Sequence, residues 1–211
     1  MSAIDADFPP GFFARLDESD DASFYAAPRF VVHIDEATIA ALTAWYAEVL
    51  APGSDVLDLM SSWVSHLPDA DALPLGRVVG LGMNAEELAA NPRLASYDVV
   101  DLNAEPRLPY GDASFDAALC AVSIQYLTRP VEVFREAARV LRPGGRVAVA
   151  TSHRCFPTKA IRAWHVLPPR DRLGAIALYL ERADGFAPAE LLDRSPPGAD
   201  PLWIVTARSK G

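Results

Sequence analysis

The chain has 211 residues, 51% of them hydrophobic, and a formal net charge of -9, so it can bury one substantial core and we expect one domain with a short appendage. Its Lys and Arg residues are scattered singly, which argues against a nucleic-acid partner because such affinity depends on neutralising phosphates. The start is acidic, no apolar run reaches membrane-spanning length, and the two cysteines form no disulfide framework, so we expect a cytoplasmic protein without a membrane partner.

The first 33 residues are rich in proline, acidic and aromatic residues. We expect an irregular or short-helical segment that packs onto the rest of the protein through its aromatic rings. The next stretch, residues 35–50, has apolar residues at helical spacing, with Asp35 as a cap and Pro52-Gly53 as a stop. It predicts a helix that leads into the core.

From Asp55 onward, short apolar runs alternate with helical or turn-rich stretches. Such runs suit central parallel strands that helices bury on both faces. The expected strands are residues 56–59, 77–81, 97–102, 115–122 and 146–151. The stretch VLDLMSSWVSH, residues 56–66, further predicts that the first strand runs through a tight turn into a helix.

The second half supplies further helices and a closing hairpin. Helices are expected at 132–141, 158–166 and 169–183, and the first of them stops at Pro143-Gly144-Gly145. Two segments, 188–195 and 201–209, are joined by PPGAD and predict an antiparallel hairpin. The alternation of strands and helices predicts a doubly wound α/β sheet.

The middle of the chain also carries a specific combination of motifs. They are Asp101 at the end of a strand, Leu108-Pro109-Tyr110 with Asp112 and Ser114-Phe115-Asp116 before the next strand, and Leu141-Arg142-Pro143-Gly144-Gly145 before the one after. This combination resembles the small-molecule class I S-adenosylmethionine-dependent methyltransferases, of the type 11 kind, over roughly residues 50–210. The resemblance implies a Rossmann-like, seven-stranded, mostly parallel sheet with a C-terminal antiparallel hairpin and an N-terminal helical lid. It divides the chain into an N-terminal segment with a lid helix, residues 1–50, and a methyltransferase-like domain, residues 51–211.

The front half departs from that family at the cofactor motif. The family has an acid followed by glycine at every second residue, where this chain has Asp58 and then Met60 and Ser62. The family's second strand ends in an acid for the ribose hydroxyls. Gly82 stands at that point here, and Asn84 offers an amide as a weaker anchor.

The resemblance implies S-adenosyl-L-methionine as the cofactor, with its methionine end at the serine turn after the first strand. The expected cofactor contacts are Asp58, Met60, Ser61, Ser62, Gly82, Met83, Asn84, Asp101, Leu102 and Ala121. Ligands of open α/β sheets bind beyond the carboxyl ends of the strands, so side chains there are candidates for the acceptor site. They are Trp63, His66, Ser123, Gln125, Arg154 and Cys155, of which Trp63, His66 and Cys155 can equally be packing or surface residues.

His153 is the leading candidate for a general base or substrate anchor, because an unperturbed imidazole titrates near neutral pH. Tyr126 is the alternative catalytic residue, and Arg154 is a candidate anchor for an anionic substrate. Cys120 is interpreted as an inert core thiol. Together with Cys155 it also invites a thiol-based reaction such as methylation of a soft metalloid, but the two cysteines lack metal-ligand spacing and we expect no metal site.

The sequence therefore predicts an enzyme that transfers a methyl group to an O, N or S atom of a small metabolite, mostly through proximity and alignment. The missing glycines and ribose acid support a second hypothesis, a catalytically silent methyltransferase-fold protein that binds or regulates. A third is a pocket with an altered cofactor or a non-methyl reaction. The N-terminal segment is expected to close over the cofactor as a lid, to pack on the sheet edge, or to do both. The acceptor and the oligomeric state are left open.

Overall fold

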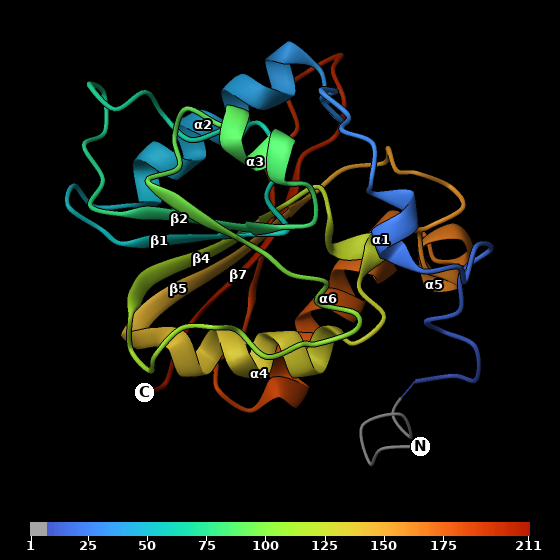
Figure 1. The fold of residues 1–211 in the computed structure, drawn as a ribbon. Helices are drawn as coiled ribbons and strands as arrows, with labels where there is room; N and C mark the ends of the chain where they lie inside the picture. The colour runs from blue at the N-terminus through green and yellow to red at the C-terminus, as the bar shows by residue number, and fades with distance from the viewer. Residues whose placement is uncertain (1–7) are drawn as a thin grey trace.

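The apolar runs form one seven-stranded sheet in a computed structural model that describes residues 8–211 (Figure 1). The strands are β1 (Val56–Leu59), β2 (Val78–Gly82), β3 (Ser96–Val99), β4 (Phe115–Ala121), β5 (Leu141–Thr151), β6 (Glu190–Asp193) and β7 (Trp203–Arg208). Their order in the sheet is β3-β2-β1-β4-β5-β7-β6. The sequence placed all of these strands, with shifts at their ends.

Five strands are parallel and the terminal pair is antiparallel. Val56 of β1 stands opposite Val78 of β2 on one side and Ala117 of β4 on the other, both in parallel register. β7 runs antiparallel to both β5 and β6, which confirms the predicted closing hairpin. The predicted fold class, a doubly wound sheet of Rossmann type, is therefore confirmed.

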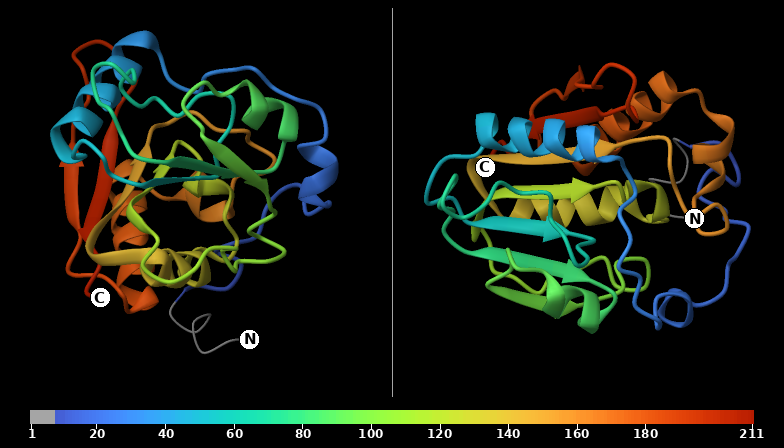
Figure 2. Two further views of the ribbon diagram at one scale, coloured as in Figure 1. Left: turned by 60° about the vertical axis from the view of Figure 1, so that its left-hand side comes forward. Right: turned by 90° about the horizontal axis from the view of Figure 1, so that it is seen from above.

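Helices cover both faces of the sheet (Figures 1 and 2). They are α1 (Asp21–Phe24), α2 (Glu36–Val49), α3 (Ala85–Ala90), α4 (Pro130–Val140), α5 (Arg162–Val166) and α6 (Pro169–Ala183). In Figure 1, α2 and α3 lie above the sheet, and α4 and α6 lie below it. Within residues 8–211, no helix is both long and apolar enough to span a membrane.

The helix predicted for residues 35–50 forms as α2. Its N-cap is Asp35, whose side chain accepts a hydrogen bond from the Thr38 N–H. Leu42, Trp45 and Tyr46 are buried against strand residues of the sheet, so α2 covers a sheet face. The apolar stripe of α2 thus faces the core, and the lid role expected of this helix stays a prediction.

The prediction of a helix directly after the first strand is wrong. Residues 60–77, all of them described, contain no helix between β1 and β2. Pro68 and Pro74 lack backbone N–H groups and disfavour helical geometry in the residues before them, so at most a short, unstable helix was available. The segment instead buries Leu67 and Leu73 beside α2, where they contribute to the core that a crossover helix would otherwise supply.

A short helix that the sequence analysis did not predict, α3, follows β2. Asn84 is its N-cap, and the Asn84 side chain accepts hydrogen bonds from the N–H groups of Glu86 and Glu87. The pattern of an Asn cap with Glu at the third helical position is a known start signal. It was available in the sequence and would have placed this helix.

The N-terminal segment packs onto the sheet domain beside the loops that follow the strands (Figure 2). Phe8, Phe12 and Phe13 cluster with Tyr179 of α6, with ring centroids of contacting pairs 5.0 to 5.9 Å apart. The expected aromatic packing is therefore confirmed for the described part, and residues 1–7 lie outside it.

A buried carboxylate fastens this segment. Asp21 is 4% exposed and accepts hydrogen bonds from Arg15 (2.7 Å) and Asn103 (2.8 Å), while the Nζ of Lys159 lies 3.0 Å away. Burial disfavours the charge, but the hydrogen bonds from Arg15, Asn103 and Lys159 outweigh it and lower the pKa of Asp21. The Asp21 cluster thus joins the N-terminal segment to the loops after β3 and β5.

We predict that Asp21→Asn lowers the free energy of unfolding by about 3 kcal/mol or more, because it leaves the fully buried Lys159 without its closest carboxylate. Denaturant unfolding measures the change. Asp112→Asn is the control, since the Asp112 side chain is 80% exposed in its ion pair with Arg139 and should cost less than about 1 kcal/mol. Equal effects of the two substitutions would contradict a fastening role for Asp21.

Candidate functional site

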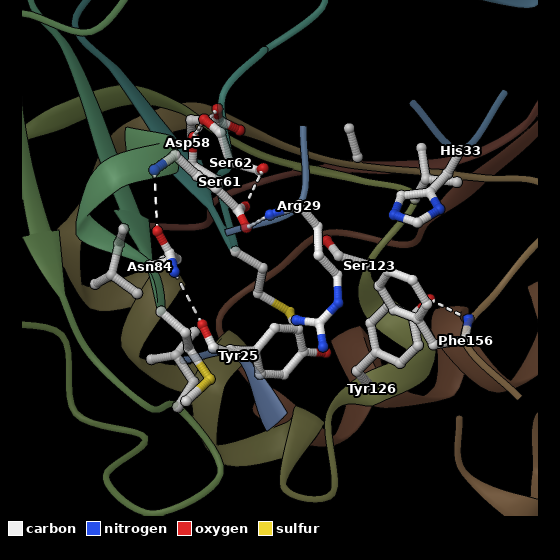
Figure 3. A pocket seen from close by; sticks show the side chains of 18 of the residues that line it. Tyr25, Arg29, His33, Asp58, Ser61, Ser62, Asn84, Ser123, Tyr126 and Phe156 are labelled. Atoms are coloured by element: carbon white, nitrogen blue, oxygen red, sulfur yellow. Dashed lines mark hydrogen bonds between the residues drawn. The ribbon is translucent and has the colours of Figure 1, made fainter. Parts of the chain in front are cut away.

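A pocket opens beyond the carboxyl ends of β1, β2, β3 and β4, on the side where the N-terminal segment crosses (Figure 3). This is where the strand order of the sheet reverses, since β1 is followed outward by β2 and β3 on one side and by β4 and β5 on the other. Open α/β sheets bind ligands at this switch point. The empty space is about 1110 Å³ when counted out to the solvent at the mouth.

Thirteen of the residues singled out in the sequence line this pocket. They are Asp58, Met60, Ser61, Ser62, Gly82, Met83, Asn84, Asp101, Leu102 and Ala121 of the expected cofactor contacts, together with His66, Ser123 and Tyr126. They are brought together because each follows or ends a neighbouring parallel strand. Their positions fit one ligand, while their individual roles stay predictions.

Two expected site residues after β5 lie elsewhere. His153 and Arg154 do not line the pocket, and their side chains are about half exposed, at 51% and 50%. Both turn towards Asp200, with His153 Nε2 3.7 Å from Asp200 Oδ1 and Arg154 Nη2 2.9 Å from Asp200 Oδ2. The carboxylate of Asp200 in the β6–β7 loop attracts them away from the pocket.

Three further candidates also lie outside the pocket lining. The Gln125 amide is buried and donates to the Val122 carbonyl, and burial raises the pKa of the Cys155 thiol. The Trp63 indole donates from Nε1 to the carbonyl of Val31 at 2.9 Å. Trp63 therefore holds the N-terminal segment in place from outside the pocket.

The glycine-free turn after β1 has an unusual backbone. Met60 adopts φ of +55°, a left-handed conformation that glycine adopts readily and that costs other residues about 1 kcal/mol. The turn therefore keeps a backbone shape suited to glycine, while the side chain of Met60 forms part of the pocket wall. The hydroxyl of Ser61 donates to Asp58 at 2.6 Å, and the hydroxyl of Ser62 donates to Glu87.

Asp58 is a buried carboxylate at the pocket floor, 3% exposed. Burial raises the pKa of Asp58 to about 6, against the opposing hydrogen bonds from Ser61 and Ser65, each 2.6 Å long. At neutral pH the site holds a costly negative charge. Such a charge suits a nearby cationic ligand group.

Gly82, at the place where the family has its ribose acid, is fixed by the neighbouring turn. A Cβ at Gly82 would lie 2.2 Å from the backbone oxygen of Ser61, so no side chain fits there. The Asn84 amide is also engaged, since its nitrogen donates to the carbonyls of Tyr25 (3.0 Å) and Ala26 (3.2 Å) while its oxygen caps α3. The expected ribose contact through Asn84 thus competes with its role in holding the N-terminal segment.

The sequence analysis missed the pocket's contribution from residues 25–33, which we call the strap. Tyr25, Arg29 and His33 of the strap line the pocket (Figure 3). Glu87 of α3 lines it as well and accepts the backbone N–H of Arg29 at 2.7 Å. The aromatic content predicted that the segment packs, but nothing in its spacing predicted which side chains enter the pocket.

The two histidines and Tyr126 of the pocket are neutral at pH 7. Burial lowers the pKa of His66 to about 4, and burial also lowers the pKa of His33. Burial raises the pKa of Tyr126 to about 12, and the hydroxyl oxygen of Tyr126 accepts the Phe156 N–H at 2.7 Å. Tyr126 is thus a neutral phenol that can donate a hydrogen bond.

Known proteins resemble the chain in these same regions. A family model described as a methyltransferase domain matches residues 61–149. The 27-O-demethylrifamycin SV methyltransferase of Amycolatopsis mediterranei is 38% identical over 78 residues, which cover 34% of this chain and 29% of that protein. Over this segment the chain is similar to S-adenosylmethionine-dependent methyltransferases. It spans less than a third of that curated relative's length in this match.

Solved structures of this methyltransferase fold agree with the sheet. The [4+2]-cyclase SpnF has a TM-score of 0.60 at 21% identity, covering 80% of each chain. A geranyl diphosphate C-methyltransferase from Streptomyces coelicolor A3(2), solved with Mg²⁺, geranyl-S-thiolodiphosphate and S-adenosyl-L-homocysteine, has a TM-score of 0.54 at 16% identity, covering 82% of this chain and 76% of that chain. At these identities the likeness concerns the fold, which hosts more than one reaction.

We predict that Gly82→Ala destabilises the protein by about 1–3 kcal/mol, since the new methyl group meets the Ser61 carbonyl. Gly174→Ala in α6 is the matched control, because it has open space around it and removes a helix glycine. It should be neutral or stabilising in the same denaturant series. A tolerated Gly82→Ala would show that the turn after β1 moves easily.

We predict that Asp58→Asn raises stability by about 1–3 kcal/mol at pH 8, since the folded pKa of about 6 lies above the unfolded value. The folded protein keeps the Asp58 proton to higher pH than the unfolded chain, so the wild type loses stability as pH rises from about 4 to 6. The gain of the variant should therefore vanish near pH 4. Unfolding at several pH values checks this.

Asp193→Asn is the control for that series. The Ser195 hydroxyl and N–H lower the pKa of Asp193, so the sign is opposite and the loss from this substitution should be present at high pH and fade on acidification. An Asp58→Asn gain that is the same at every pH would mean that charge burial is not its cause.

Proposed function

We propose that the protein binds S-adenosyl-L-methionine in this pocket and transfers its methyl group to an O, N or S atom of a small metabolite in the cytoplasm. The observation that carries this is the convergence of all ten expected cofactor contacts in one pocket at the switch point of a methyltransferase fold. The match to a methyltransferase-domain family model over residues 61–149 supports the activity, and the free thiols Cys120 and Cys155, which suit a reducing compartment, support the location.

The residues present fit such a cofactor with changed anchors. Asp101 lines the pocket and uses its Oδ1 to accept the N–H groups of Asn103 and Ala104, which leaves Oδ2 without a hydrogen-bond partner among the described residues. We propose that Asp101 takes the adenine amine. Glu87, 8% exposed, is the carboxylate nearest in chain order to Gly82 on the pocket wall and would take the ribose hydroxyls.

The charge at the pocket floor suits the other end of the cofactor. We propose that Asp58 lies near the amino group of the methionine portion, where a positive charge offsets the cost of keeping the carboxylate buried and ionised. Met60 and the serine turn would enclose the methionine chain.

The bound cofactor supplies an activated methyl group on a sulfonium. Transfer would move that methyl group from the sulfur to the acceptor atom, and the acceptor would give up its proton to base or solvent. The pocket contributes position and a dry wall, because Tyr126, Phe156 and the strap enclose the space. Its imidazoles, His33 and His66, are neutral at pH 7 and can accept a hydrogen bond from the acceptor, while strong proton abstraction is not provided.

A second function is favoured by one observation. The hydroxyls of Ser61 and Ser62 and the amide of Asn84 are already bonded within the protein, as in a site that no longer turns over. A silent methyltransferase-fold protein would bind ligand or a partner without methyl transfer. The two functions differ in whether label appears in a product.

We predict that the protein binds S-adenosyl-L-methionine and S-adenosyl-L-homocysteine by calorimetry, and that Ser62→Trp weakens both by about tenfold or more by filling the pocket. Ser23→Trp is the control, since Ser23 is exposed on α1 and does not line the pocket. Methyl-labelled cofactor incubated with a metabolite extract should then give a labelled small molecule. Binding without labelled product would support the silent alternative, and absence of binding would refute the proposal.

A further inference from the structure

The strap carries a cation, Arg29, whose guanidinium has no anionic partner within residues 8–211. Arg29 lines the pocket, and its guanidinium carbon lies 4.3 Å from the centre of the Phe24 ring. The rings of Phe156 and Tyr25 are 5.7 and 5.9 Å away, so the cation is bracketed by aromatic faces (Figure 3). Contacts of this kind hold the planar group in place while leaving its edge free.

The edge of this guanidinium is almost unused. Its hydrogen bond among the described residues runs from Nη1 to the Ala27 carbonyl at 3.3 Å, and no carboxylate in residues 8–211 pairs with it. A guanidinium has five N–H donors in a fixed fork. Arg15 and Arg154, in contrast, each meet a carboxylate, on Asp21 and Asp200 respectively.

The backbone around Arg29 is held independently of this side chain. The Arg29 N–H donates to Glu87 at 2.7 Å, and the Val31 carbonyl two residues later accepts the indole N–H of Trp63. Glu87 thus bonds the main chain of Arg29 while the guanidinium extends into the pocket. A site whose donors are already oriented loses less entropy when a ligand binds.

We propose that Arg29 is the anion-binding residue of the pocket and takes a carboxylate or a comparable small oxyanion through its free N–H fork. The inference deepens the function proposed above and in part rests on it. The same chemistry has two sources: the carboxylate at the amino-acid end of the cofactor, or an acidic group on the methyl acceptor. It replaces Arg154, which the sequence favoured for this role and which lies outside the pocket.

The two sources are separated by calorimetry on the full chain with three probes. S-adenosyl-L-homocysteine has the amino-acid end, 5′-deoxy-5′-methylthioadenosine lacks it, and inorganic phosphate titrated into the protein saturated with S-adenosyl-L-homocysteine tests a second anion position. The variants are Arg29→Gln, Arg29→Lys and the control Arg154→Gln, which removes an arginine outside the pocket. Thermal unfolding of each variant verifies that it is folded.

If the cofactor supplies the anion, Arg29→Gln weakens S-adenosyl-L-homocysteine by about tenfold or more, Arg29→Lys weakens it less, and methylthioadenosine is unchanged. If the acceptor supplies it, the phosphate binding of the saturated wild type is lost in Arg29→Gln while both adenosyl ligands bind as before. Arg154→Gln should change none of these.

A folded Arg29→Gln that binds all three probes like the wild type overturns the proposal. If the wild type binds neither adenosyl ligand, the function proposed above fails instead. The role of Arg29 is then decided by phosphate titrated into the free protein, where equal binding by wild type and Arg29→Gln, or no binding by either, refutes it.

Discussion

The order of the whole pocket depends on one buried charge, the carboxylate of Asp21. It draws together Arg15 from the N-terminal segment, Asn103 from the loop after β3 and Lys159 from the loop after β5. A charge at 4% exposure is tolerable only while its partners stay in place, so the three segments are fixed relative to each other. The strap, residues 25–33, begins four residues after Asp21 in the chain. The fixed position of Asp21 therefore limits where the strap side chains can lie in the pocket.

At the pocket wall the turn after β1 and the end of β2 constrain each other. The turn after β1 lies so close to β2 that the Ser61 carbonyl excludes any side chain at Gly82. An acid at the end of β2 is therefore incompatible with this turn, and the nearby carboxylate comes from Glu87, one helical turn later.

The sequence was sufficient for elements whose pattern is local. Alternating apolar runs placed the strands, and Asp35 with the periodic residues after it placed α2. The sequence could not predict where the side chains after β5 point. His153 and Arg154 turn towards Asp200, a residue some 46 positions away in chain order. Arg29 was missed for a related reason: its position depends on long-range bonds to Glu87 and from Trp63.

The packing of α2 also bears on the order in which parts of the chain can fold. Asp35 and Asp200 exchange hydrogen bonds between backbone N–H groups and side-chain carboxylates across 165 positions, and Thr38 donates to the Asp200 carbonyl. Trp45 and Tyr46 share their core cluster with Ile204 of β7. The same cluster contains Val56 of β1 and Val78 of β2, which follow α2 closely in the chain. The apolar face of α2 can therefore pack on β1 and β2 first, and its burial is completed only when the C-terminal hairpin joins the sheet.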